Sequence, residues 1–111
     1  MKDCIFCKIA KKEEKAEIIH ENDNLIVFKD IKPKAPIHYL IVPKKHIKSI
    51  NELKEENKDL IGEMVLTAKK IAGKVGIKDS GYKLIFNVGR GGGQIVDHLH
   101  LHVLGGWKKS S

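Results

Sequence analysis

Three histidines alternate with apolar residues near the end of the chain, in the stretch His98-Leu99-His100-Leu101-His102-Val103-Leu104. Successive side chains of a β-strand point to opposite faces, so this alternation predicts a strand with all three imidazoles on one face. A neutral imidazole can act as a nucleophile, a general base or a metal ligand. Because burial of three imidazoles demands partners for six ring nitrogens, the row favours a chemical site over a structural or merely exposed strand.

A glycine-rich loop precedes this row at residues 87–94, with the sequence Asn-Val-Gly-Arg-Gly-Gly-Gly-Gln. Backbone N–H groups of such a loop can surround phosphate oxygens without crowding. The loop lacks the Gly-Lys-Ser/Thr ending of a P-loop and does not fit a dinucleotide-binding fingerprint, so it is weak evidence alone. Two hypotheses for the histidines follow: they bind a catalytic zinc, or one of them attacks phosphorus directly. The neighbouring loop favours attack on phosphorus.

Hydrophobic periodicity and turn chemistry predict the elements that position these groups. A short helix is expected at residues 4–11, and a capping box at residues 49–52 marks the start of a long helix that ends at Gly76. Short apolar runs bounded by turn residues predict strands at 17–20, 25–29, 37–42, 82–88 and 98–104. Short turns between strands, with one long helix inserted, predict an α+β fold whose sheet is an antiparallel five-stranded meander.

Length and composition limit the class of protein. The 111 residues make one domain, 1–111, with a core at about 4–106 and a short tail at 107–111. A net charge of +7 favours anionic partners, but 5% aromatic residues and the absence of an arginine-rich block argue against nucleic acid. No apolar run approaches the ~20 residues of a membrane span, and no signal peptide is visible. We therefore expect a cytoplasmic protein without membrane partners, whose two cysteines are thiols or metal ligands.

The histidine row matches the His-φ-His-φ-His-φ-φ signature of the histidine triad (HIT) superfamily. Other motifs resemble its Hint branch, and they are Asp30-Ile31, Ala35-Pro36-x-His38, Val42-Pro43-Lys44-Lys45-His46-Ile47, Asn87-x-Gly89, Gly92-Gly93-Gln94 and Gly105-Gly106. This resemblance covers about residues 4–106 and implies a HIT-like fold, a symmetric homodimer and purine nucleotide binding. It further implies hydrolysis of nucleoside 5′-phosphoramidates, of the adenosine 5′-monophosphoramidase type, through a covalent nucleotidyl-histidine.

The same resemblance implies roles for single residues. His100 is the nucleophile, His102 contacts the phosphate and assists the leaving group, and His38 supports the triad. Asp30, next to Ile31, holds the ribose hydroxyls. Phosphate contacts are expected from Asn87, Gly93, Gln94 and the backbone N–H of Ile95, which stands where many members have a serine. The walls for the purine are expected from Phe6, Ile9, Phe28 and Ile31, for which core packing is the competing interpretation.

Cys4 and Cys7 form a Cys-x-x-Cys pair whose role the spacing alone leaves open. A redox pair and two incidental helix thiols are both compatible with it, although no strand precedes it as in thioredoxin-like proteins. Bacterial HIT proteins with this motif resemble the chain, and this implies a structural zinc on Cys4, Cys7, His46 and His98. Two cysteines and two histidines form a closed tetrahedral set, suited to structure. This assignment places His98 on the metal and leaves His100 free for chemistry.

Two other functions stay open beside the phosphoramidase. One is a dinucleoside polyphosphate hydrolase of the Fhit type, although Gly105-Gly106 and the Cys-x-x-Cys pair speak against it. The other is a nucleotide-binding regulator whose hydrolysis is incidental. Turnover of a phosphoramidate and of a dinucleoside polyphosphate distinguishes the three.

Overall fold

The computed structural model describes residues 3–108 and places them in two α-helices, five strands and three 3₁₀ turns. In chain order the main elements are α1 (Ile5–Ala10), β1 (Ile18–Glu21), β2 (Leu25–Lys29), β3 (Ile37–Pro43), α2 (Lys58–Lys74), β4 (Tyr82–Ile85) and β5 (Leu101–Gly105). The 3₁₀ turns are η1 (Ile50–Glu52), η2 (Glu55–Asn57) and η3 (Arg90–Gly92). Residues 109–111 of the predicted tail lie outside the described part. None of the described helices combines the length and the hydropathy that crossing a membrane requires.

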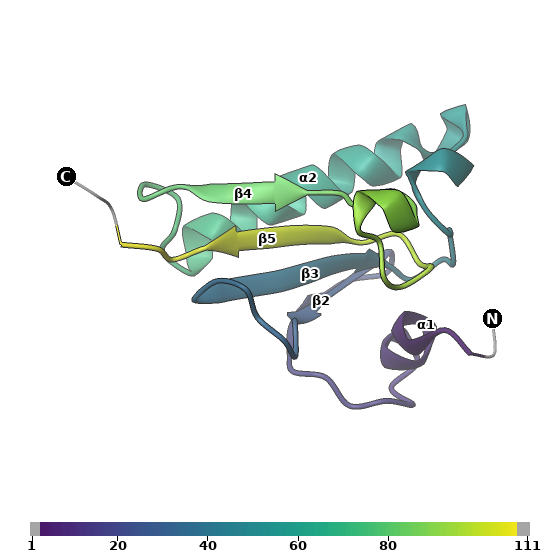
Figure 1. Cartoon of the computed structure of the whole chain (residues 1–111), viewed down its shortest axis with the longest axis horizontal. Coiled ribbons are helices and arrows are strands. Elements are labelled where there is room, and N and C mark those ends of the chain that lie inside the picture. The colour runs from purple at the N-terminus through teal and green to yellow at the C-terminus, as the bar shows by residue number, and fades with distance from the viewer. Residues whose placement is uncertain (1–2, 109–111) are drawn as a thin grey trace.

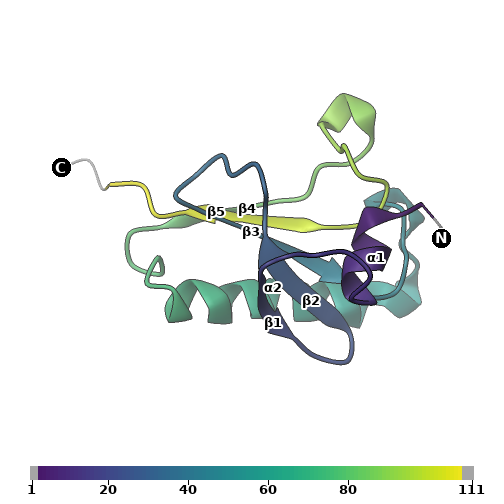
Figure 2. The ribbon, with the colours of Figure 1, turned by 90° about the horizontal axis from the view of Figure 1, so that it is seen from below.

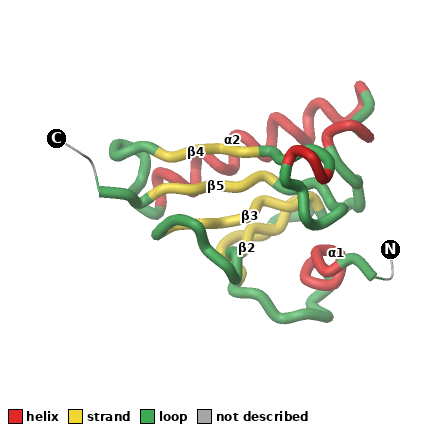
Figure 3. Tube along the Cα trace, viewed as in Figure 1, coloured by secondary structure: helices red, strands yellow, loops and turns green. Residues whose placement is uncertain are grey.

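All five strands form one antiparallel sheet in the order β1-β2-β3-β5-β4. Figures 1 and 3 show β2, β3, β5 and β4 of this sheet in that sequence. The predicted α+β class and five-stranded antiparallel sheet are confirmed. The meander is interrupted at one place, because β5 enters the sheet between β3 and β4. Burial explains this order: four of the five residues of β5 are buried, whereas three of the four residues of β4 are exposed. A buried strand suits the centre of a sheet, and an exposed one suits its edge.

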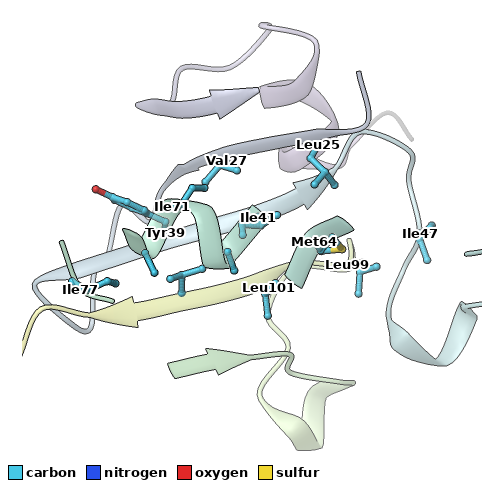
Figure 4. Packing of buried hydrophobic residues seen from close by; sticks show 13 residues of the cluster. Leu25, Val27, Tyr39, Ile41, Ile47, Met64, Ile71, Ile77, Leu99 and Leu101 are labelled. Carbon is cyan, nitrogen blue, oxygen red and sulfur yellow. The ribbon is translucent and has the colours of Figure 1, made fainter. Parts of the chain in front are cut away.

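Helix α2 covers one face of the sheet, and α1 packs against the other (Figure 2). The strands between the helices are apolar on both sides because each side faces a helix. Along β2, Leu25 and Val27 pack in the cluster under α2, while Ile26 and Phe28 pack in the cluster with α1. Figure 4 shows the cluster under α2, to which the helix contributes Met64, Ala68, Ile71 and Ala72.

Three details differ from the predicted boundaries. Ser49 does cap a turn, since its Oγ accepts from the N–H of Asn51 at 3.1 Å, but that turn is η1 and the long helix begins only at Lys58. Strand β4 ends at Ile85 rather than at residue 88, where the chain leaves the sheet for the glycine-rich loop. Strand β5 begins at Leu101 rather than at residue 98.

The histidine row joins the sheet only where β5 begins, at Leu101, and the residues before it lie in a bend and an extended stretch. The predicted alternation of faces nevertheless holds along the row. Its apolar members, all in the cluster under α2, are Leu99, Leu101 and Val103. On the opposite face, Phe6 of α1 packs edge-on against the rings of His98 and His100. The elements therefore place the histidines between the sheet and α1.

Candidate active site and metal site

Four side chains, from β3, from β5 and from the residues just before β5 and just after β2, meet on the face of the sheet that α2 does not cover. Nε2 of His38 lies 2.9 Å from Nδ1 of His102, on neighbouring strands. Oδ2 of Asp30 lies 3.4 Å from the same Nε2. The ring of His100 lies beside that of His102, with 5.0 Å between their centroids. The structure thus brings together the three predicted catalytic histidines and the predicted ribose-binding carboxylate.

Hydrogen bonds determine which nitrogen of His38 and of His102 carries the proton. The backbone N–H of Lys34 donates to Nδ1 of His38 at 3.0 Å, so a neutral His38 carries its proton on Nε2. The Nε2–H of His38 points at Nδ1 of His102, so Nδ1 of His102 accepts this hydrogen bond. A neutral His102 must then carry its own proton on Nε2. His102 consequently presents an N–H donor on the side of its ring turned away from His38.

His100 has the opposite tautomer. Its Nδ1 lies 2.6 Å from the carbonyl oxygen of His98, which can only accept, so Nδ1 carries the proton. Nε2 of His100 keeps its lone pair and is available as a nucleophile. Phe6 packs edge-to-face against this ring, with centroids 5.1 Å apart and an interplanar angle of 84°. A fixed lone pair therefore lies on the ring next to the one that offers an N–H donor, which is what nucleophilic attack with an assisted leaving group requires.

Burial favours the neutral form of all three rings. Burial lowers the pKa of His102 to about 4, and the neighbouring rings of His100 and His38 contribute, against the opposing effect of Asp30. The pKa values of His100 and His38 are also lowered, in each case chiefly by burial. A neutral imidazole keeps the lone pair that a nucleophile needs at neutral pH.

Asp30, His38 and His102 also lie close enough together to hold a metal ion, with their ligand atoms within 4.8 Å of one another. A metal on Nε2 of His38 would need the lone pair of that atom and would move the ring proton to Nδ1. The backbone N–H of Lys34 already points at Nδ1, so two donors would face each other there. The hydrogen bonds of this cluster therefore suit proton placement better than metal binding.

The glycine-rich loop rises from the same face of the sheet as α1 (Figure 2). Gly89 and Gly93 have φ angles of +70° and +87°, which glycine adopts without strain. The side chain of Asn87 donates to the carbonyl of Gly92 at 2.9 Å and braces the turn from within. A Cβ on residue 93 would lie 3.4 Å from Asn87 Nδ2, an ordinary van der Waals distance, so the positive φ angle rather than crowding favours glycine there.

Gln94 is 2% exposed, and its side chain is committed to the loop. Its Oε1 accepts from the N–H of Gly89 at 2.9 Å, and its Nε2 donates to the carbonyl of Lys48 at 2.7 Å. Ile95, the next residue, turns its side chain outward and is 76% exposed. The phosphate contacts expected of Gln94 and Ile95 stay predictions, and in this structure the Gln94 side chain shapes the loop.

Two residues that the sequence analysis did not single out close this loop. The guanidinium of Arg90 donates to the carbonyl of Gln94 at 2.6 Å and to both carboxylate oxygens of Asp97, at 2.9 and 3.2 Å. A bidentate pair of this kind fixes geometry as well as charge, even where it is exposed. The opposite charges seven residues apart were the available signal, but only the folded loop shows that they meet.

The predicted purine walls fall into two groups. Phe6, Ile9 and Phe28 are buried in the cluster with α1, so core packing accounts for them. Ile31 is 88% exposed, beside Asp30, and is available to flank a ligand. Asp30 itself accepts from the backbone N–H of Lys32 at 2.8 Å through Oδ1, which orients its carboxylate.

The predicted metal ligands Cys4, Cys7, His46 and His98 form a second cluster, with their ligand atoms within 4.8 Å of one another. Nδ1 of His98 lies 3.2 Å from Sγ of Cys4, 3.6 Å from Sγ of Cys7 and 3.2 Å from Nδ1 of His46. Sγ of Cys7 lies 3.3 Å from Nδ1 of His46. Tetrahedral zinc with ordinary bond lengths separates two nitrogen ligands by about 3.3 Å and a nitrogen from a sulfur by about 3.6 Å. These four residues therefore fit zinc.

The tautomer of His98 fits the same role. Its Nε2 donates to the carbonyl of Pro43 at 2.7 Å, which leaves the lone pair on Nδ1, the atom that faces the thiols. Burial lowers the pKa of His98 to about 4, so the ring is a neutral ligand. Burial and the adjacent Cys4 raise the pKa of the Cys7 thiol, and a bound cation would reverse that effect.

A pocket of about 540 Å³ lies between the glycine-rich loop and the predicted metal ligands Cys4 and His46, and His100 does not line it. Its lining joins the N-terminal end of α1 to the outer side of the loop and consists of Asp3, Cys4, Ile5, His46, Lys48, Arg90, Ile95, Val96 and Asp97. The catalytic histidines are not part of it. We place the candidate active site by the histidine geometry instead.

Comparisons with known proteins agree with this geometry. The family model described as scavenger mRNA decapping enzyme C-term binding matches residues 3–111. Protein HitA of Neisseria gonorrhoeae is 46% identical over 105 residues, which are 95% of this chain and 97% of HitA. A HIT family hydrolase from Legionella pneumophila superposes with a TM-score of 0.94 at 46% identity, over 97% of this chain and 96% of that one. A Zn-bound histidine triad family protein from Mycobacterium smegmatis does so with a TM-score of 0.82 at 27% identity, over 98% and 81%.

A row of three histidines that leads into β5 of a five-stranded antiparallel sheet, next to a glycine-rich loop, defines a histidine triad protein. The chain belongs to the HIT family, and its class is that of the HIT family hydrolases.

Proposed function

We propose that the chain hydrolyses nucleoside 5′-phosphoramidates, such as adenosine 5′-monophosphoramidate, through a covalent nucleotidyl-His100. The pair of tautomers at His100 and His102 carries this proposal, because it sets a nucleophilic lone pair beside an N–H donor. The carboxylate of Asp30, 3.4 Å from His38, supports a ribose contact because it can accept from both hydroxyls of a cis-diol. The backbone N–H groups of the loop, with Gly93 and Ile95, take the phosphate oxygens.

The chemistry has two displacement steps. The lone pair of His100 Nε2 attacks phosphorus, and the P–N bond of the substrate breaks with its electron pair on nitrogen. That nitrogen takes up a proton and departs as an amine, assisted by the N–H of His102. Water then attacks the nucleotidyl-histidine, His100 regains its lone pair, and the nucleoside monophosphate is released. The proton of this water restores the site, so each cycle consumes one water. The carbonyl of His98 stabilises the positive charge of the substituted ring through Nδ1–H.

The test is the release of AMP from adenosine 5′-monophosphoramidate by the wild-type chain and by His100→Asn. Loss of the nucleophile should lower kcat by about 10³-fold or more. His20→Asn is the matched control, because His20 lies on β1 at the far edge of the sheet. Full activity in the His100→Asn protein would sink the mechanism.

Two other outcomes identify the competing functions. Faster turnover of a diadenosine polyphosphate than of the phosphoramidate would assign the chain to dinucleoside polyphosphate hydrolysis. Tight AMP binding with negligible turnover of both substrates would assign it to the nucleotide-binding regulators. Dinucleoside polyphosphate hydrolysis could use the same His100 geometry as phosphoramidate hydrolysis. Only the comparison of the two substrates therefore separates these two activities.

We also propose that zinc occupies the cluster of Cys4, Cys7, His46 and His98. The four ligand distances and the tautomer of His98 support this. Bound there, zinc would supply a closed structural crosslink between the start of α1, the segment after β3 and the segment before β5, without an open position for catalysis.

A homodimer is the remaining part of the proposal. Large apolar side chains are exposed on α2, where Val65 and Leu66 are 41% and 62% exposed. Leu84 and Ile85 are exposed on β4, which forms one edge of the sheet. Exposed apolar residues of this kind on an edge strand and a helix support an interface with a second copy of the chain.

A further inference from the structure

The backbone amide of Lys34 begins a chain of hydrogen bonds that leads into the active site. Unlike a histidine nitrogen, a peptide N–H can donate but cannot accept, so its direction is fixed. It donates to Nδ1 of His38 at 3.0 Å, and Nε2 of His38 lies 2.9 Å from Nδ1 of His102. Each link dictates the direction of the next.

We propose that the Lys34 amide is a positioning group, which through His38 holds the proton of His102 on Nε2, the nitrogen that faces a substrate. Its catalytic consequence rests on the proposed function, whereas the tautomers themselves do not. The alternative, with protons on Nδ1 of both rings, would set the Nδ1–H of His38 against the Lys34 N–H, two donors 3.0 Å apart. Because His38 is 4% exposed, no surrounding water relieves such a contact.

This arrangement makes His38 an anchor rather than a proton carrier. If His38 passed its Nε2 proton to His102, its ring would keep no proton, because Lys34 cannot supply one to Nδ1. The groups that face this pair are the carboxylate of Asp30, 3.4 Å from His38 Nε2, and the ring of His100, 5.0 Å from that of His102. Neither contact reverses the direction set by the amide.

The test uses the ¹⁵N chemical shifts of the histidine rings, which separate a nitrogen that carries hydrogen from one with a lone pair. Lys34→Pro removes the amide hydrogen, and Lys34→Ala is the matched control that keeps it. In the wild-type chain and in Lys34→Ala, we expect the Nε2–H form at both His38 and His102. In Lys34→Pro, the Nδ1–H form should become substantial at both rings, and thermal unfolding checks that the variant is folded.

A second pair of variants tests the same chain of bonds without altering the loop. In His38→Gln the new amide can donate to His102 Nδ1, so His102 should keep its proton on Nε2. In His38→Glu the carboxylate can only accept, so His102 should move its proton to Nδ1. A wild-type His38 with its proton on Nδ1, or a His102 tautomer that is the same in both variants, would overturn the proposal. Expected tautomers in a chain without phosphoramidase activity would instead refute only the proposed function.

Discussion

The role that we propose for each histidine follows from which of its two nitrogens forms a hydrogen bond with a neighbour. The carbonyl of Pro43 holds Nε2 of His98 and leaves Nδ1 for a metal, while the carbonyl of His98 holds Nδ1 of His100 and leaves Nε2 for a nucleophile. The residue types and the alternation were readable from the sequence. The tautomers were not, because the partner of His98 lies 55 residues away and is a backbone carbonyl that any residue type carries.

Loss of one metal ligand gives the prediction at this scale. His46→Asn should abolish stoichiometric zinc and lower the free energy of unfolding by about 3–4 kcal/mol, the linkage expected for a ligand at 100 to 1,000 times its Kd. Metal analysis and denaturant unfolding of the purified chain, with and without a chelator, provide the measurement.

His20→Asn is the control for this variant, because His20 lies outside the cluster. It should retain one zinc per chain and its sensitivity to chelation. A wild-type chain that contains no metal, and whose stability zinc does not change, would contradict the assignment.

Among the elements, β5 carries His102 and begins directly after His100, and its far end is tightly packed. A Cβ at Gly105 would lie 2.8 Å from Cδ1 of Ile77 and 3.1 Å from Cβ of Tyr82. A larger residue at this position would therefore force the side chains of Ile77 and Tyr82 to shift. The packing ties β5 both to β4 and to the chain that follows α2.

Gly105→Ala should accordingly destabilise the fold by about 1–3 kcal/mol through overpacking. Gly91→Ala is the matched control: a Cβ there meets nothing within 4 Å, and the change in stability should stay within about 0.5 kcal/mol. Denaturant midpoints measure both. Equal stabilities of the two variants would contradict this prediction, because they would show that Ile77 and Tyr82 accommodate the added methyl group at little cost.

Elements were predictable where one pattern determined them. Leu25–Lys29 was predicted with its observed bounds, because four apolar residues stand between turn residues. The position of β5 inside the sheet was not, since periodicity reports which faces are buried but not which strands are neighbours. Likewise, Ser49 has cap chemistry, but whether a 3₁₀ turn or a long helix follows depends on the residues after it.

For the whole molecule, the prediction concerns the exposed apolar residues of α2 and β4. Leu66→Lys places a charge in the proposed interface and should raise the dimer Kd at least tenfold, which corresponds to about 1.4 kcal/mol. Light scattering after size-exclusion chromatography, over a range of concentrations, measures this. Ile18→Lys is the control, because Ile18 is also exposed but lies on β1, the opposite edge of the sheet. A wild-type chain that is monomeric at all concentrations would refute the dimer.

The contact between Cys4 and His98 has a consequence for how the chain is made. These residues are 94 positions apart, so Cys4 leaves the ribosome long before the histidine that it contacts. Helix α1 has only six residues, too few for a stable isolated helix, and its cluster includes residues of β2 and β3. It therefore docks with its full set of partners only after residues 96–100 have been synthesised. Metal capture at this cluster would accordingly require a chain that extends at least to His98, and chains truncated before this residue would be left with free thiols open to oxidation.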